Sequence, residues 1–271
     1  MKIIHLLLAT AAAAHTAGAL ADELDRMRST GEIVLAHRES SLLFSYLDAN
    51  NEPVGYSVDP CLRVVEALRK ELKMSALKVR WLPVTSASRN PAIAEKRASL
   101  ECGSTTNNAE RRKLVDYTIA HFIASSRFLV KTDKGIAQMQ DLAGKRVIST
   151  KGTTNVKALY RLNEEHGLKM DIAEASDHAE AFGAVQANKA DAFAMDDVLL
   201  YGLLAISSNP KSFAVVGKPM TVERYAMMMP KGELALKAIV DARSVESFLV
   251  VRLTLSTKIG SNIQFRQTTL T

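Results

Sequence analysis

The chain has 271 residues, of which 47% are hydrophobic, 24% charged and 6% aromatic, so it can bury one or two hydrophobic cores. Its net charge is +6 at pH 7, but the lysines and arginines are scattered among few aromatic residues, which argues against a nucleic-acid surface. Cys61 and Cys102 stand 41 positions apart without a nearby histidine pair, which argues against a metal site. In an exported protein they could form one disulfide, although spacing alone does not give the distance between them.

The N-terminus has the pattern of a secretory signal peptide. Lys2 precedes an apolar stretch at residues 3–14, and Ala19-Leu20-Ala21 stands directly before the charged Asp22-Glu23. A positive start, an apolar centre and an A-x-A site predict cleavage after Ala21. The apolar stretch is shorter than the roughly 20 residues that a membrane-spanning helix needs. We therefore expect residues 1–21 to be removed during export.

The mature chain alternates predicted strands and helices. Asp59-Pro60 predicts a helix start, with Asp59 as N-cap and Pro60 at the first helical position, where no amide hydrogen is needed. Polar breaks at residues 132–135 and 217–219 divide the pattern into two units. Strands are expected at residues 32–37, 77–83, 100–102, 115–118 and 127–131 in the first unit, at 146–149, 171–173, 190–195 and 213–216 in the second, and at 225–229 after it.

Alternation of strands and helices predicts an α/β fold with parallel sheets covered on both faces. The two breaks predict two lobes with a cleft between them: residues 22–131 with a return at 222–242 form the first lobe, and residues 132–221 form the second. In open α/β sheets, ligands bind beyond the carboxyl ends of the strands. Polar residues that directly follow predicted strands are Arg38, Ser86, Arg89, Ser104, Thr106, Arg111, Thr153 and Asp196. We expect them to share one site.

The most informative stretch is residues 101–112, which combine a glycine, several hydroxyls and two arginines. Guanidinium and carboxylate pair through two parallel charge-assisted hydrogen bonds, and hydroxyls can add donors, so such a stretch suits a carboxylate ligand. By itself it could equally be a capped turn followed by a solvated basic segment.

The order of motifs resembles the periplasmic glutamate/aspartate-binding proteins of ABC transporters, which belong to family 3 of the bacterial solute-binding proteins. The resemblance covers about residues 24–240. The motifs are His37-Arg38-Glu39-Ser40-Ser41, Gly55-Tyr56-Ser57-Val58-Asp59, the stretch 101–111, Asp141-Leu142-Ala143-Gly144-Lys145, Gly152-Thr153-Thr154 and Met195-Asp196-Asp197. It implies the two-lobed periplasmic-binding-protein fold of type II, a periplasmic location, a monomer, no cofactor, and an ABC permease in the membrane as the partner.

The resemblance also implies a role for each site residue. Arg111 would pair with the α-carboxylate of L-glutamate or L-aspartate, assisted by Thr153 and Thr154. Asp196 would accept from the α-ammonium, with Ser104 and Thr106. Arg38, Ser86 and Arg89 would hold the side-chain carboxylate, with His178 nearby. Three arginines and one aspartate would match the charges of the ligand, which predicts at least roughly ten- to hundredfold discrimination against glutamine and asparagine.

Other functions are open to this sequence. Periplasmic cyclohexadienyl dehydratases have the same fold, but their reaction needs a general acid near a leaving hydroxyl, and no spare acid stands in the motifs. A receptor sensor domain is weaker, since no membrane segment or signalling domain follows.

A degenerate, non-functional copy is the last alternative. From residue 243 the chain departs from the family pattern, and residues 248–251 and 253–255 look strand-like. Leu43 and Lys96 stand where proline and glycine are common. Met227 stands where a cysteine partner for Cys102 can occur, which leaves the disulfide open.

Overall fold

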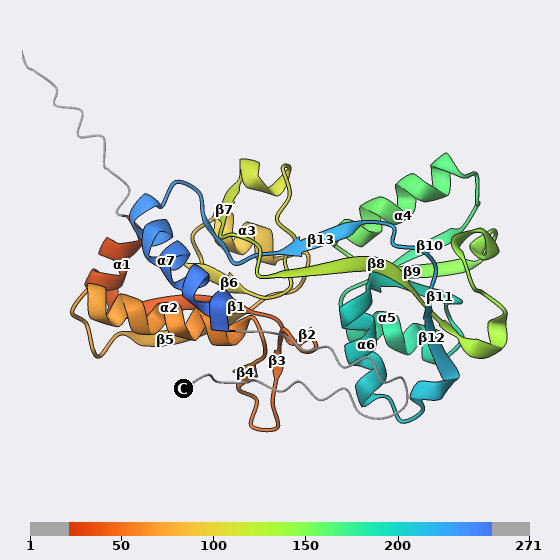
Figure 1. Ribbon diagram of the computed structural model, residues 1–271, viewed down its shortest axis with the longest axis horizontal. Helices are drawn as coiled ribbons and strands as arrows, with labels where there is room; N and C mark the ends of the chain where they lie inside the picture. The colour runs from red at the N-terminus through yellow and green to blue at the C-terminus, as the bar shows by residue number, and fades with distance from the viewer. Residues whose placement is uncertain (1–21, 251–271) are drawn as a thin grey trace, which may run out of the picture.

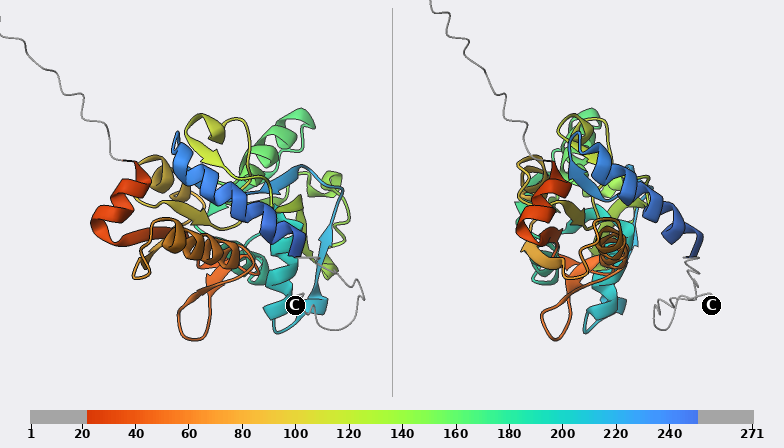
Figure 2. Two further views of the ribbon diagram at one scale, coloured as in Figure 1. Left: turned by 60° about the vertical axis from the view of Figure 1, so that its left-hand side comes forward. Right: turned by 90° about the vertical axis from the view of Figure 1, so that its left-hand side faces the viewer.

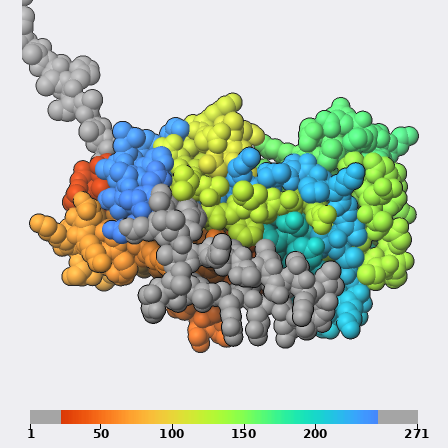
Figure 3. Space-filling model, viewed as in Figure 1, coloured from red at the N-terminus to blue at the C-terminus, as the bar shows by residue number. Residues whose placement is uncertain are grey.

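The computed structural model describes residues 22–250, with side chains up to residue 243. The chain forms two α/β lobes that lie side by side and are joined by the strands β8 and β13 (Figure 1). The space-filling view shows the lobes meeting along the middle of the molecule, with a notch at the upper edge between the yellow residues of the first lobe and the green residues of the second (Figure 3). The expected two-lobed α/β architecture is confirmed.

The first lobe is built on a five-stranded sheet in the order β5-β1-β6-β14-β7. Its strands are β1 (Glu32–His37), β5 (Lys78–Pro83), β6 (Leu100–Cys102), β7 (Val115–Tyr117) and β14 (Met228–Pro230). The first three strands in chain order are parallel as predicted, whereas β14 is antiparallel to both β6 and β7 because the chain returns from the second lobe.

Helices cover both faces of this sheet. One core contains α1 (Glu23–Thr30), α2 (Val58–Glu71) and α7 (Leu234–Val250), with Met27, Val65, Leu68 and Val240 buried against Ile33 and Leu35. Figure 2 shows α7 lying beside α2 on the outside of the lobe. On the other face, α3 (Arg89–Ala94) buries Ala92 and Ile93 against β1 and β14.

The second lobe is built on a sheet in the order β10-β9-β11-β8-β12. Its strands are β8 (Phe122–Lys131), β9 (Arg146–Thr150), β10 (Asp171–Ala175), β11 (Ala192–Asp196) and β12 (Phe213–Val216). Strands β9, β10 and β11 are parallel, and β8 runs antiparallel to β11 and β12. Helices α5 (His178–Gln186) and α6 (Asp197–Ile206) pack on one face, and α4 (Thr154–Glu165) packs on the other.

The connection between the lobes is a two-stranded ribbon rather than the polar breaks expected from the sequence. Strand β13 (Val222–Tyr225) pairs antiparallel with residues 122–125 of β8, and hydrogen bonds between the same two segments continue towards the first lobe, where Thr118 N donates to Met227 O. Residues 126–130 of β8 pair with β11, so the second lobe begins before residue 132. The break was predicted at residues 132–135 because these residues are polar. In the structure they begin with a short 3-10 helix (η2, Thr132–Lys134), which packs within the second lobe, where the Thr132 hydroxyl donates to Ser212 O.

A small third sheet extends from the first lobe to the ribbon. It consists of β2 (Ser40–Ser41), β3 (Ser45–Leu47) and β4 (Pro53–Val54). Phe44, between β2 and β3, packs edge-on against Phe122 and Tyr225 of the ribbon, with ring centroids 4.9 and 5.1 Å apart. These rings belong to the core of the second lobe, so the loop of residues 42–44 ties the lobes together beside the ribbon.

The structure pairs Cys61 with Cys102, with their Cα atoms 6.1 Å apart. Met227 does not replace the bridge but packs against it, with its Sδ 3.5 Å from Cys61 Sγ. A link that closes a loop of 41 residues contributes about 4 kcal/mol in the chain-entropy description. The disulfide fastens the end of β6 to α2, directly before the Gly103-Ser104 loop.

Three local expectations need correction. Helix α2 begins at Val58 with Ser57 as N-cap, so Asp59 and Pro60 lie within the first turn, where the missing amide of proline has no intrahelical partner in any case. The strand expected at residues 225–229 is interrupted, because β13 ends at Tyr225 and β14 begins at Met228. Residues 248–250, which were predicted to be strand-like, are the last residues of helix α7. Adding a residue to an existing helix needs no partner strand, since each residue bonds within the helix itself. Residues 251–255 lie outside the described part, as do the predicted signal residues 1–21.

Candidate functional site

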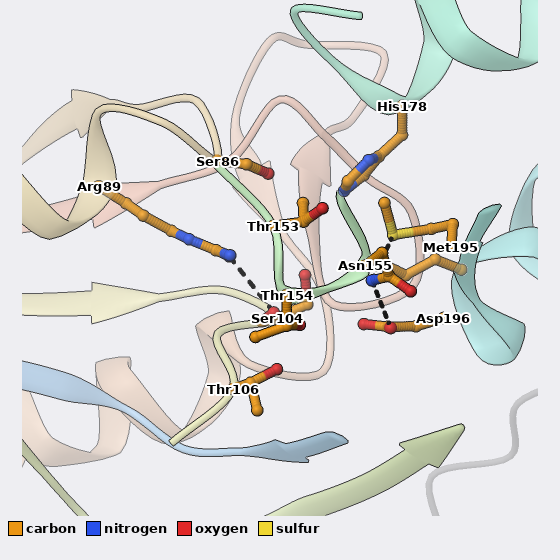
Figure 4. A pocket seen from close by; sticks show the side chains of 11 residues that line it. Ser86, Arg89, Ser104, Thr106, Thr153, Thr154, Asn155, His178, Met195 and Asp196 are labelled. Carbon is orange, nitrogen blue, oxygen red and sulfur yellow. Dashed lines mark hydrogen bonds between the residues drawn. The ribbon is translucent and has the colours of Figure 1, made fainter. Parts of the chain in front are cut away.

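Side chains from both lobes converge on a small cavity beside the ribbon (Figure 4). Its volume is about 10 Å³, which is about the space that one water molecule needs. The residues that line it are Ser86, Arg89, Ser104, Thr106, Thr153, Thr154, Asn155, His178, Met195, Asp196 and Leu199. Eight of the ten predicted site residues are among them. A ligand larger than a water molecule can therefore enter only when the lobes or their side chains move apart.

The first-lobe wall is formed by Ser86 and Arg89, which follow β5, and by the loop that follows β6. This loop runs along the ribbon, because Asn107 N donates to Arg224 O and Ala226 N donates to Thr105 O. The pairing turns Thr106 towards the cavity. At Gly103 a side chain would be excluded, since a Cβ there would lie 2.2 Å from Glu101 Oε1 and 3.1 Å from Arg38 Cγ. Close packing of the buried Glu101 and Arg38 side chains therefore favours glycine at this position of the motif.

The second-lobe wall consists of helix N-termini and the end of β11. Thr153 is the N-cap of α4: its hydroxyl donates to Thr150 O at 2.7 Å and accepts from Val156 N at 3.3 Å. The first amides of α4 have no intrahelical acceptor and, with the helix dipole, form a place that favours an anion. His178 begins α5, and Asp196 ends β11.

Asp196 is a buried carboxylate at one end of the cavity. Asn155 Nδ2 donates to Asp196 Oδ1 at 2.8 Å, and the Tyr225 hydroxyl donates to Asp196 Oδ2. Burial raises the pKa of Asp196 to about 7, and the negative charge of Glu223 adds to the rise. Ionised Asp196 is thus costly unless a cation lies beside it, which suits the α-ammonium of an amino acid.

The opposite end of the cavity is basic. Arg89 donates to Ser104 O at 3.3 Å, while its Nε has no hydrogen-bond partner among the described residues. His178 Nδ1 contacts Thr150 Oγ1 at 2.8 Å, and burial, with the nearby charges of Arg38 and Arg89, lowers the pKa of His178 well below its usual value. His178 is therefore neutral at pH 7. The expected neighbourhood of Ser86, Arg89 and His178 is present.

Arg38 lies against this basic end but does not line the cavity. Its side chain is 1% exposed, and none of its three guanidinium nitrogens has a hydrogen-bond partner among the residues that the structure describes. Burial lowers the pKa of Arg38 to about 9, with a further contribution from the charge of Arg89. A buried guanidinium with unused donors normally has an anion as its partner.

Arg111 is the second predicted residue outside the cavity lining. Its Nη1 donates to Thr106 O at 2.9 Å in the first lobe, and its Nη2 donates to Gly152 O at 3.2 Å in the second. The guanidinium therefore bridges the two lobes through backbone carbonyls. A guanidinium has five donors, so donors remain for a ligand.

Several buried groups around the site are not among the residues predicted from the sequence. Asn155 holds Asp196, and Glu223, on β13, accepts hydrogen bonds from Thr106 and Thr154. Glu101 is fully buried, and neither of its carboxylate oxygens has a hydrogen-bond partner within the described region. The predicted balance of three arginines against one aspartate therefore omits two carboxylates. Asn155 could have been found because it directly follows Thr153-Thr154, whereas Glu223 carries no local signal.

The lobes touch closely at Gly152. Its φ is +79°, and a Cβ there would lie 2.5 Å from Ala87 Cα of the first lobe. Glycine is needed both for the backbone angle and for the approach of the two lobes.

The described residues offer neither a metal site nor a membrane-spanning helix. Within residues 22–243, no group of three or more histidine, cysteine, aspartate or glutamate side chains could hold a metal ion. No helix in the described part of the chain has the length and apolarity needed to cross a membrane.

A two-lobed α/β fold with a small polar cavity beside the ribbon that joins the lobes is typical of extracytoplasmic solute-binding proteins. The chain belongs to the bacterial extracellular solute-binding proteins, family 3, whose family model matches residues 33–245. It is 42% identical over 255 residues to an L-glutamate/L-aspartate-binding protein of Pseudomonas aeruginosa, covering 92% of this chain and 84% of the relative. It is 39% identical over 241 residues to a glutamate/aspartate import solute-binding protein of Salmonella typhimurium, covering 89% and 80%.

Solved structures of more distant proteins share the fold. A mutant of ArgBP from T. maritima superposes with a TM-score of 0.72 at 19% identity, covering 82% of this chain and 92% of that one. A solute receptor for L-cysteine of Neisseria gonorrhoeae gives a TM-score of 0.70 at 22% identity, covering 83% and 87%. Family membership confirms the predicted solute-binding class and favours it over the dehydratase alternative.

Proposed function

We propose that the protein captures L-glutamate or L-aspartate in the periplasm and delivers it to an ABC-transporter permease. The observation that carries the proposal is the separation of charge across the cavity: Arg89 lines it on one side, with buried Arg38 close by, and Asp196 lies on the opposite side (Figure 4). An acidic amino acid needs donors for two carboxylates and acceptors for one ammonium. The names of the 39–42% identical relatives support the same ligands.

In this proposal Arg38, Arg89 and Ser86 bind the side-chain carboxylate. The unused donors of Arg38 Nε, Nη1 and Nη2, Arg89 Nε and Ser86 Oγ are the supporting evidence, because each would gain a charged acceptor. The α-carboxylate binds to the remaining donors of Arg111 and to the first amides of α4. The α-ammonium donates to Asp196, Ser104 and Thr106.

Uptake proceeds by hinge motion of the two lobes. The cavity is too small for an amino acid, so ligand enters when the ribbon of β8 and β13 bends and the lobes separate. A ligand that contacts both lobes binds the closed form more tightly than the open form, and it therefore favours closure. Periplasmic binding proteins are known to close around their ligands by such a hinge motion. We propose that the protein is exported by residues 1–21, acts as a monomer and docks on its permease when closed.

The contact at Gly152 provides a test of closure. We expect Gly152→Ala to weaken glutamate binding at least about tenfold. The added Cβ would overlap with Ala87 in the closed form, and a destabilisation of that form by about 1.4 kcal/mol is enough for a tenfold loss of affinity. Gly144→Ala is the matched control: Gly144 also has a positive φ, of +68°, but no atom lies within 4 Å of its added Cβ. Titration calorimetry on both variants measures the difference. Equal affinities in the two variants would contradict closure at this contact.

The ligand assignment is tested by thermal unfolding of the mature chain. We expect L-glutamate or L-aspartate to raise Tm, because a ligand at a hundredfold excess over Kd stabilises the native state by about 2.7 kcal/mol. L-Glutamine at the same concentration should have a much smaller effect, because its amide leaves a guanidinium without an anion. A folded sample whose Tm responds to neither acidic amino acid would refute the proposal.

A further inference from the structure

Glu223 is a buried carboxylate that no ligand role explains. It lies on β13 in the ribbon between the lobes and is 2% exposed. Its Oε2 accepts from Thr106 Oγ1 at 2.5 Å and from Thr154 Oγ1 at 2.8 Å, and its Oε1 accepts from Thr221 Oγ1 at 2.5 Å. Thr106 comes from the first lobe and Thr154 from the second. Both line the cavity, but Glu223 does not.

The hydrogen bonds of Glu223 decide what these threonines can offer to a ligand. A hydroxyl group has one hydrogen to donate and two lone pairs to accept. An ionised carboxylate only accepts, so the single hydrogen of each threonine points at Glu223 and away from the cavity. Towards the cavity, Thr106 Oγ1 and Thr154 Oγ1 therefore present lone pairs. Together with Asp196, they make this end of the site a group of acceptors.

We propose that Glu223 is a positioning residue that fixes Thr106 and Thr154 as hydrogen-bond acceptors and so selects ligands that carry an α-ammonium group. This inference rests on the proposed function. The family resemblance implies that Thr154 assists Arg111 at the α-carboxylate. In this proposal the Thr154 hydroxyl instead accepts from the ammonium, while its backbone amide stays available to the carboxylate. A site with donors at this end would bind a dicarboxylate without an amine equally well.

The test compares L-glutamate with glutarate, which has both carboxylates and no ammonium. In Glu223→Gln, an amide nitrogen in the place of Oε2 donates to both Thr106 and Thr154, whose own hydrogens must then turn towards the cavity. We expect glutamate affinity to fall at least about tenfold, since a hydrogen bond to a charged group contributes at least that factor. Glutarate affinity should stay within about threefold, because no ammonium bond is lost. Titration calorimetry gives both dissociation constants.

Two further variants separate positioning from a merely structural role. Thr221→Val removes the hydroxyl on the other oxygen of Glu223 and should leave the preference for glutamate over glutarate unchanged. Thr106→Val should reduce the same preference without altering Glu223, while Thr106→Ser, which keeps the hydroxyl, should restore it. In a double-variant cycle, Thr106→Val and Glu223→Gln should combine to less than the product of their single effects, because they act through one hydroxyl.

The outcomes distinguish this inference from the proposed function. If the unmodified protein binds neither glutamate nor aspartate, the proposed function fails. If it binds glutamate but Glu223→Gln lowers glutamate and glutarate affinity by the same factor, Glu223 is only structural and the inference is overturned. If Glu223→Gln does not fold, the Thr106→Val and Thr106→Ser pair decides: an unchanged preference in Thr106→Val overturns the inference, and a reduced one restored by serine supports it.

Discussion

Replacing Arg38 with methionine is expected to lower the affinity for L-glutamate at least about a hundredfold. Each hydrogen bond to a charged group contributes about 1.5–3 kcal/mol, and the planar guanidinium can make two to one carboxylate. The three guanidinium nitrogens of Arg38 have no other hydrogen-bond partner in the described chain. The variant should also lose most of its preference for glutamate over glutamine, since a neutral amide no longer leaves Arg38 unpaired. Titration calorimetry with both ligands measures this.

A surface arginine is the control for this experiment. Arg161, on α4, is exposed and forms an ion pair with Glu165, so Arg161→Met changes the net charge equally without touching the cavity. We expect its affinity to stay within about twofold of the unmodified protein, because exposed ion pairs contribute little. Circular dichroism checks that both variants are folded. Wild-type glutamate affinity in folded Arg38→Met would rule out Arg38 as a carboxylate ligand.

Binding is expected to depend on pH through Asp196. The pKa of Asp196 is raised to about 7 without a ligand, and a bound ammonium favours its ionised form and lowers that pKa. Binding at pH 6 must therefore remove a proton from Asp196, so affinity should fall about tenfold for each pH unit below 7. Calorimetry in buffers of different ionisation enthalpy should detect proton release at pH 6 and little at pH 8.5. Uptake of protons on binding would contradict this account.

The same shift makes Asp196 destabilising without a ligand. Its folded pKa lies above the unfolded value of 3.8, so its contribution to stability is lost as pH rises through that interval. The loss at pH 8 amounts to at most about 4 kcal/mol, because one pKa unit corresponds to 1.36 kcal/mol. We therefore expect Asp196→Asn to lose glutamate binding yet to unfold at a higher Tm at pH 8, by up to about 12 °C.

The matching measurement at pH 5 provides the control for Asp196→Asn. There Asp196 is still protonated in the folded protein, so the gain in Tm should fall to roughly a third. Scanning calorimetry of both proteins at the two pH values gives the comparison. A gain in Tm that does not depend on pH would show that asparagine stabilises through packing rather than through the lost charge.

The ends of the strands could be predicted from the sequence, and most residues that line the cavity lie at or just after these ends. Ser86, Ser104, Thr106 and Thr153 follow strands and Asp196 ends one, and the carboxyl ends of parallel strands meet at one edge of a sheet. The local sequence pattern was misleading where a polar stretch was interpreted as the boundary between the lobes. Residues 132–135 are a polar surface turn of the second lobe, whereas the crossing runs through residues 118–125, where Phe122 packs against Phe44.

The sequence by itself determined the two-lobed class and the kinds of chemical group that reach the cleft, because strand periodicity and capping motifs act over a few neighbouring residues. Only the tertiary structure decided how those groups are used. It pairs Glu223 with threonines 117 and 69 positions away and buries Asp196 under Tyr225. Hydrogen-bond direction and pKa depend on distance through space and on exclusion of water, and neither of these follows from separation along the chain.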